Sequence, residues 1–325
     1  MKIQYLLRIG ILFVIINFSA CNTSKNLSQS DINKIDIKII TADIDNFWTA
    51  YDSLENTTDS AYTIQHLYID KASDELKKVL EVRPDFTANN FISAINQYPK
   101  FWKSVRNCTK DISKKKEIIE SALIKIKQIY PEFNIPTICF CITPTAFGGT
   151  ASKDHKVLFI GAEIVLADSN VIVTDFNNLL KDIIGTLDVV PYIVHESVHT
   201  AQIPKCKPSV FSETMTEGSA DFITSYILKD NFNKKIYEYG YQNECEIWKD
   251  IKPDLENDNN YSKWFGSYDK NKHPDLGYFI GYRIVQSYYE KATNKDQALI
   301  DIIQMKKPKH IFKKSEYNGN CLNED

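Results

Sequence analysis

The chain has 325 residues, of which 43% are hydrophobic and 12% aromatic, and its formal net charge is −3. This composition is typical of an ordinary globular protein that can bury one large core or two small ones. Because the sequence has no basic excess, we expect no nucleic-acid partner.

Residues 1–20 are typical of a bacterial signal peptide. Lys2 and Arg8 give a positive start, and the apolar run 9–18 is shorter than the roughly 20 residues that span a bilayer as a helix. The following residues, "FSAC", resemble a lipobox and predict that Cys21 carries a lipid. The alternative is plain secretion, with Cys21 as an ordinary thiol.

Removal of this signal peptide would leave 37 basic and 42 acidic residues, so the mature net charge is 37 − 42 = −5. The polar stretch 21–34 is predicted to be a tether, and residues 35–325 are predicted to form the folded domain. The sequence therefore predicts a protein of the bacterial cell envelope, held through its lipid on the periplasmic or outer-membrane face.

Hydrophobic spacing divides the domain into three parts. Apolar residues three and four positions apart predict helices over about 35–130 and again over about 177–290. Between them, β-branched and aromatic residues predict a strand pair at about 135–166, interrupted by two glycines. We therefore expect an α+β fold, mostly α-helical, with a small antiparallel strand layer.

Six cysteines remain besides Cys21, an even number in a compartment that permits disulfides. Their pairing does not follow from the sequence. Cys139 and Cys141 are two positions apart in a predicted strand, so they are expected to point to the same face as neighbouring buried thiols. A lone C-x-C is a weak signal for a metal site.

The stretch "DVVPYIVHESVHTAQIP", residues 188–204, contains the pattern H-E-x-x-H. On a helix, His195 and His199 project from the same face and can bind one metal ion. Glu196 lies about 100° around that helix, near enough to reach a water without being a ligand. The apolar residues before His195 predict that the two imidazoles and the Glu196 carboxylate are buried. Burying these polar groups without partners is costly.

Catalytic zinc usually has three protein ligands and one open position. Gln202 and Lys205 occupy the positions where the extended zincin motif would need Gly and His, so the third ligand must lie elsewhere. Downstream, the segment "TEGSAD" supplies Glu217 and, four residues later, Asp221.

This arrangement resembles the gluzincin zinc peptidases, which combine H-E-x-x-H with E-x-x-x-D on a following helix. The resemblance implies a zincin-like fold, in which the small strand layer lies beside the H-E-x-x-H helix. It also implies that Glu217 is the third ligand of one zinc ion per chain. It also implies that Asp221 accepts an N–H from a ligating histidine and fixes its tautomer.

Four alternatives stay open at this point. Glu213, four residues before Glu217, could be the ligand instead. Residues 214–217 also fit a capping box, in which Glu217 would only cap its own helix, and Asp221 could be a solvated helix-face residue. His273 is a further possible donor.

The motifs "HESVHTAQ", "EGSADF" and "GYFIGYR" are similar to those of the bacterial predicted zinc-dependent protease domains of unknown function. They are also similar to those of the related gliding-motility-associated lipoproteins. By the gluzincin resemblance, Gly148 and Gly149 would belong to an edge strand that pairs with an extended substrate; a plain hairpin is the alternative. Tyr278 and Tyr282 are candidate donors to an oxyanion, although such aromatic spacing also fits a core.

The sequence therefore predicts a membrane-anchored zinc peptidase with a peptide or protein substrate in the envelope, in which Glu196 is the general base. Two other functions remain possible. One is a non-catalytic zinc lipoprotein of a motility or surface assembly, and the other is an amidase that acts on cell-wall peptides.

Overall fold

Four short strands in the middle of the molecule form one sheet in the order β1-β2-β4-β3. The strands are β1 (Ile39–Ile40), β2 (Thr137–Cys141), β3 (Gly149–Ala151) and β4 (Val157–Gly161). The computed structural model describes residues 29–32, 34–110, 112–176, 178–202, 208–230, 233–266 and 275–321. The predictions for the signal peptide, Cys21, Lys205 and His273 lie outside these residues.

The sheet is mixed, so the predicted antiparallel strand layer is wrong. β2 runs parallel to both β1 and β4, and only β3 pairs antiparallel, with Thr150 opposite Phe159. Every residue of β4 is buried, as expected for a central parallel strand that is covered on both faces. The α+β class is confirmed, with four strands in place of the expected pair.

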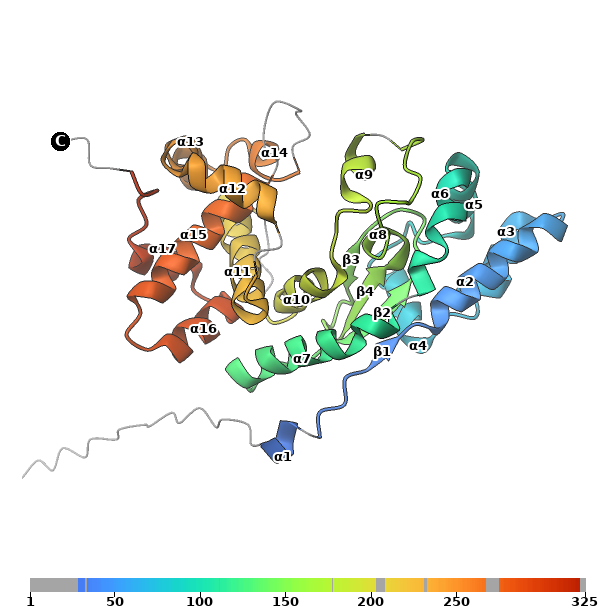
Figure 1. Cartoon of the computed structure of the whole chain (residues 1–325), viewed down its shortest axis with the longest axis horizontal. Coiled ribbons are helices and arrows are strands. Elements are labelled where there is room, and N and C mark those ends of the chain that lie inside the picture. The colour runs from blue at the N-terminus through green and yellow to red at the C-terminus, as the bar shows by residue number, and fades with distance from the viewer. Residues whose placement is uncertain are drawn as a thin grey trace, which may run out of the picture.

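Helices occupy most of the rest of the described chain (Figure 1). Before β2 the helices are α1 (Gln29–Ile32), α2 (Ala42–Ser53), α3 (Ser60–Ile64), α4 (Asp74–Lys77), α5 (Ala88–Gln97), α6 (Pro99–Val105) and α7 (Ser113–Ile129). After β4 they are α8 (Ala162–Val165), α9 (Asn178–Ile183), α10 (Val189–His199), α11 (Val210–Leu228), α12 (Lys234–Gln242), α13 (Glu244–Asn257), α14 (Tyr261–Trp264), α15 (Leu276–Lys291), α16 (Lys295–Gln304) and α17 (Pro308–Ser315).

An aromatic core joins the N-terminal helices. Phe47 is fully buried, and its ring lies 5.0 to 5.8 Å from the rings of Trp48, Tyr68, Phe91 and Trp102. These separations are those of favourable edge-to-face and tilted aromatic pairs. The predicted helical block over 35–130 is therefore present, except that Ile39 and Ile40 form the edge strand β1.

Two glycines let α11 and α15 cross in close contact. A Cβ atom on Gly218 would lie 2.2 Å from the backbone carbon of Gly281, and one on Gly281 would lie 1.7 Å from the carbonyl oxygen of Thr214. Only glycine permits such an approach of two helix backbones. This crossing brings the residue before Gly218, which is Glu217, towards the start of α15.

A disulfide between Cys245 and Cys321 ties the end of the described chain to α13. Cys139 and Cys141 are buried free thiols, in agreement with their expected burial. Within the described residues no helix is both long and apolar enough to cross a membrane.

Candidate metal site and cleft

The motif histidines lie at the end of α10. Asp188 caps the N-terminus of this helix by accepting from the backbone N–H of Val190, and the following apolar turns are buried. His195 is 7% exposed, as the apolar sequence before it predicts. The helix ends at His199, so both imidazoles project from its last two turns.

Glu217 comes from the middle of α11. That helix starts at Val210 with a capping box formed by Ser209 and Ser212. The alternative in which residues 214–217 cap a helix is therefore wrong, and Glu217 is free to point at α10.

Three potential ligand atoms meet between α10 and α11. The Nε2 atoms of His195 and His199 are 3.0 Å apart, and Oε2 of Glu217 lies 3.1 Å from the first and 3.2 Å from the second. Tetrahedral zinc with bonds of about 2.0–2.1 Å holds its ligand atoms about 3.3 Å from one another. The triangle is therefore close to the size that zinc requires.

Neighbouring side chains fix the tautomers of both imidazoles. Nδ1 of His195 lies 2.7 Å from Oδ1 of Asp221, and a carboxylate can only accept, so this nitrogen donates. Nδ1 of His199 lies 2.8 Å from Oε1 of Gln202, whose amide nitrogen donates to the carbonyl oxygen of Thr216 at 3.1 Å. A carbonyl oxygen can only accept, so this bond fixes the amide orientation. In their neutral forms both imidazoles consequently present the lone pair of Nε2 to the triangle.

Lone pairs from the two Nε2 atoms and from one oxygen of Glu217 thus point at the same space. They repel one another unless a positive charge, a proton or a metal ion, lies between them. Burial opposes protonation of His195, but Asp221 and Glu217 outweigh burial and raise the pKa of His195 well above its ordinary value. Burial alone would raise the pKa of Glu217, but the two imidazoles hold that pKa well below its usual range. The donor set and its geometry fit a zinc ion.

Asp221 is 1% exposed and is held by further hydrogen bonds. Its Oδ2 accepts from the hydroxyl of Tyr237 at 2.7 Å and from Nδ2 of Asn233 at 3.3 Å. The position beside His195 agrees with the role that the gluzincin resemblance implies for Asp221, and disagrees with a solvated helix-face residue. Among the described residues, the acidic, histidine and cysteine side chains that could hold a metal are His195, His199 and Glu217; Glu213 does not join them.

Glu196 lies beside this triangle without belonging to it. It lines a cavity of about 430 Å³ together with His195 and Tyr278. The ring of Tyr278 stacks over that of His195, with centroids 6.1 Å apart. The apolar wall of the same cavity consists of Ala146, Phe147, Ile164, Leu180, Ile183, Leu187 and Ile236.

Gly149, the first residue of β3, lies against the catalytic candidate Glu196 and against Tyr192, and Gly148, just before the strand, lies against Tyr192. A Cβ atom on Gly149 would lie 3.2 Å from Cδ of Glu196 and 3.0 Å from the hydroxyl of Tyr192, and one on Gly148 would lie 2.7 Å from that hydroxyl. β3 is an edge strand of the sheet. The two glycines therefore let an edge strand lie directly against α10.

The structure separates the two tyrosines that the sequence proposed as oxyanion donors. Tyr278 lines the cavity, whereas Tyr282 packs against Phe222 and Tyr237 and is not part of the cavity wall. Tyr282 therefore fits the alternative reading, an aromatic residue of the core.

Two residues of the site were missed by sequence reasoning. Tyr192 forms a hydrogen bond with Glu196, and Gln202 holds His199. Tyr192 is four residues before Glu196, and Gln202 is three residues after His199. The same-face spacing that pairs His195 with His199 could therefore have identified Tyr192, whereas Gln202 lies beyond the last residue of α10.

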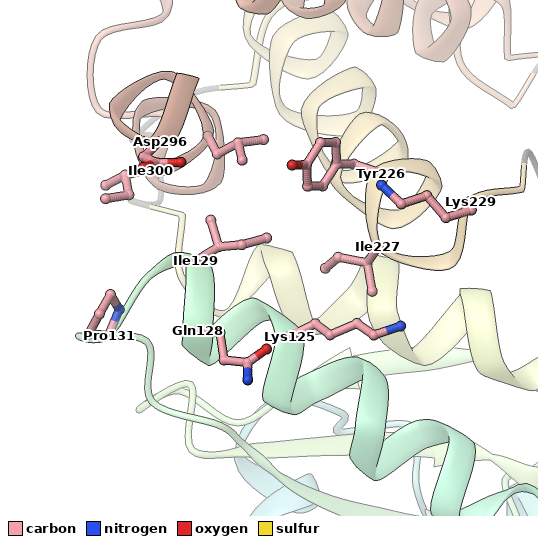
Figure 2. A pocket seen from close by; sticks show the side chains of 10 residues that line it. Lys125, Gln128, Ile129, Pro131, Tyr226, Ile227, Lys229, Asp296 and Ile300 are labelled. Carbon is pink, nitrogen blue, oxygen red and sulfur yellow. The ribbon is translucent and has the colours of Figure 1, made fainter. Parts of the chain in front are cut away.

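A second cavity of about 480 Å³ lies away from the histidines, between α7, α11 and α16 (Figure 2). Lys125 and Lys229 line it together with apolar residues such as Ile129 and Ile227. It contains no histidine and a single acid, Asp296, so it has no comparable donor set. The cavity beside His195 is therefore the candidate active site.

The family model described as gliding motility protein GldB matches residues 25–319, which is most of the chain. The chain belongs to the GldB lipoprotein family. The expected resemblance to gliding-motility-associated lipoproteins is thereby confirmed, and the family supports a lipid-anchored envelope protein. Among the functions predicted from the sequence, the match supports the motility-associated lipoprotein more directly than the peptidase.

A search of curated proteins found no match to this chain. No solved structure matched it either, so the zincin-like architecture expected from the sequence stays a prediction.

Proposed function

We propose that this GldB-family lipoprotein binds one zinc ion through His195, His199 and Glu217 and hydrolyses peptide bonds of an envelope peptide or protein. The observation that carries the proposal is the position of Glu196, which lines the cavity beside the three ligand atoms and is not one of them. A purely structural zinc site is usually closed by four protein ligands.

In this proposal each side chain of the cavity has one task. Zinc, when bound, would polarise the scissile carbonyl and lower the pKa of a water molecule. Glu196 accepts a proton from the attacking water and returns it to the leaving amine. Tyr192 orients Glu196 through its hydrogen bond, and the free edge of β3 pairs with the extended substrate.

The Glu196→Gln variant tests this function, because it keeps the size of the side chain and removes the base. We expect it to retain one zinc per chain and to lose peptide hydrolysis by about 10²- to 10⁴-fold. Zinc content is measured beside cleavage of a broad peptide library for the wild type, for Glu196→Gln and for a His195→Ala, His199→Ala variant. Equal cleavage by the wild type and Glu196→Gln, or stoichiometric zinc in the double variant, would contradict the proposal.

The family match favours a second candidate, a zinc-containing envelope lipoprotein that acts in a motility assembly without catalysis. It predicts that Glu196→Gln supports gliding as well as the wild type does, whereas loss of His195 and His199 abolishes it. The peptidase predicts a gliding defect in both variants if the reaction serves motility. Complementation of a gliding strain from which the gene is deleted distinguishes these two outcomes.

A further inference from the structure

An exposed group of lysines lies where α16 is joined to α17. Lys306, Lys307, Lys309, Lys313 and Lys314 are all exposed, as is His310 between them. No acidic residue occurs between Asp301 and Glu316. In the part of the chain that the structure describes, none of these five lysines forms an ion pair.

The opposite face of α17 is fixed in the protein core. Ile311 is 2% exposed, and the ring of Phe312 lies 5.7 Å from that of Phe211. The carbonyl oxygen of Ser315 accepts from the Ser287 hydroxyl at 2.8 Å and from Nζ of Lys291 at 2.7 Å. Lys309, Lys313 and Lys314 are therefore presented from the outer side of a helix that is held in place, and Lys306 and Lys307 directly precede that helix.

The positive charge of this segment is opposite in sign to the net charge of the whole protein. The mature chain is expected to carry −5, yet the nine residues from Lys306 to Lys314 carry five lysines and no acid. A surface of average composition would intersperse both signs, as the ion pairs on other helices do. Such a patch attracts an anionic partner over about a Debye length.

The position of the patch indicates which anionic surface it meets. In the view of Figure 1, the α16–α17 junction, α7 and α1 lie along the lower side, whereas α9 and α12, which line the catalytic cavity, lie along the upper side. Seven residues lie between Cys21 and Gln29, the first residue of α1, and the eight steps from Cys21 to Gln29 can span at most about 28 Å. The lipid expected on Cys21 therefore keeps this side near the bilayer.

We propose that the lysines around α17 bind the anionic phospholipid headgroups of the membrane that carries the lipid anchor. With this contact the protein has two attachments on one side, and the cavity beside His195 faces away from the bilayer. Each lysine near an anionic surface strengthens binding by about fivefold. Several lysines together therefore give an attachment that can be measured without the lipid.

The experiment uses the mature chain, residues 21–325, with Cys21→Ser so that no lipid can be attached. Binding is measured by co-sedimentation with vesicles of phosphatidylcholine alone and with vesicles that contain phosphatidylglycerol. The test variant is Lys306→Gln, Lys307→Gln, Lys309→Gln, Lys313→Gln. The matched control, Lys100→Gln, Lys103→Gln, Lys235→Gln, Lys252→Gln, changes four exposed lysines of α6, α12 and α13 and has the same net charge.

We expect binding to the phosphatidylglycerol vesicles only, a loss of more than about 100-fold in the α17 variant, and little change in the control. Binding should also weaken at 0.5 M salt. Equal binding of both vesicle types, or equal loss in the two variants, would overturn the proposal. Lysine-dependent binding to soluble polyglutamate, without binding to vesicles, would assign the patch to an acidic protein and overturn it as well. Circular dichroism verifies that both variants are folded.

Discussion

Asp221 holds the Nδ1 atom of His195 at 2.7 Å, on the side of the imidazole opposite to Glu217. This contact makes Nδ1 the donor and leaves the lone pair of Nε2 available to the proposed zinc ion. Because Asp221 is 1% exposed, its negative charge is little screened by solvent, so we expect it to strengthen the binding of the proposed zinc ion by His195.

Replacing Asp221 by Asn should weaken zinc binding by about 10- to 100-fold without abolishing it, since the shape stays and the charge is lost. Zinc affinity is measured by competition with a chelator of known affinity. Tyr237→Phe removes one hydrogen bond to Asp221 and keeps the carboxylate, so it should have a smaller effect. An unchanged zinc affinity in Asp221→Asn would show that the contact does not tune the ligand.

Gln202 should support His199 in the same manner. Gln202→Leu keeps most of the side-chain volume but removes the acceptor for Nδ1 of His199, and we expect zinc affinity to fall by about 10-fold or more. Ser219→Ala removes one acceptor of the Gln202 amide and the hydrogen bond from Ser219 to the Thr216 carbonyl, but it keeps Gln202 and its own bond to that carbonyl, so it serves as the milder control. If both variants bind zinc as the wild type does, the tautomer of His199 is set by something other than Gln202.

The sequence predicts best those parts of the site that are built from contacts between residues close together in the chain. His195, Glu196 and His199 share one helix, so their spacing alone predicts their arrangement. The motif spacing, together with the gluzincin resemblance, predicted Glu217 and Asp221 on a following helix. Gln202 was noted only as a departure from the zincin motif, because its contact with His199 depends on how the chain continues after α10.

The sheet was harder to predict for a physical reason. Ile39 and Ile40 form a strand of only two residues, too short to show any alternation, and they pair with residues almost one hundred positions later. Whether β2 and β4 run parallel depends on the path of the chain through β3, which hydrophobic spacing does not encode. The Cys245–Cys321 pair is likewise a tertiary contact, 76 residues apart in sequence.

Tyr192→Phe tests how Glu196 is oriented. Loss of the hydroxyl should lower kcat for peptide hydrolysis by about 10-fold and leave zinc content unchanged, because Tyr192 contacts the base and no ligand. Tyr282→Phe is the matched control, since Tyr282 does not line the cavity. Steady-state kinetics with a cleaved library peptide measures the effect. Equal kcat values for the two variants would contradict a role for Tyr192.

The last prediction concerns Glu163, a fully buried acid at the start of α8. Its carboxyl group accepts from the backbone N–H of Thr143 at 3.1 Å and contacts the Thr143 hydroxyl, which accepts from the N–H of Ala146. Glu163 therefore holds the loop that leads to Gly148 and the cavity. Burial raises the pKa of Glu163 from 4.5 to about 8, although the hydrogen bonds from Thr143 partly oppose this.

Between pH 4.5 and 8 the folded protein consequently keeps a proton on Glu163 that the unfolded chain releases. Stability from this group is full below pH 4.5 and falls as the pH rises through this window, by up to about 4 kcal/mol in the free energy of unfolding. Glu163→Gln has no such proton, so its stability should fall less between pH 5 and pH 8. Urea unfolding of both proteins at the two pH values, at saturating zinc, measures the difference. Zinc binding would contribute the same pH dependence to both proteins, so only the difference between their slopes of unfolding free energy against pH reports on Glu163. Parallel slopes would show that Glu163 is ionised in the folded state.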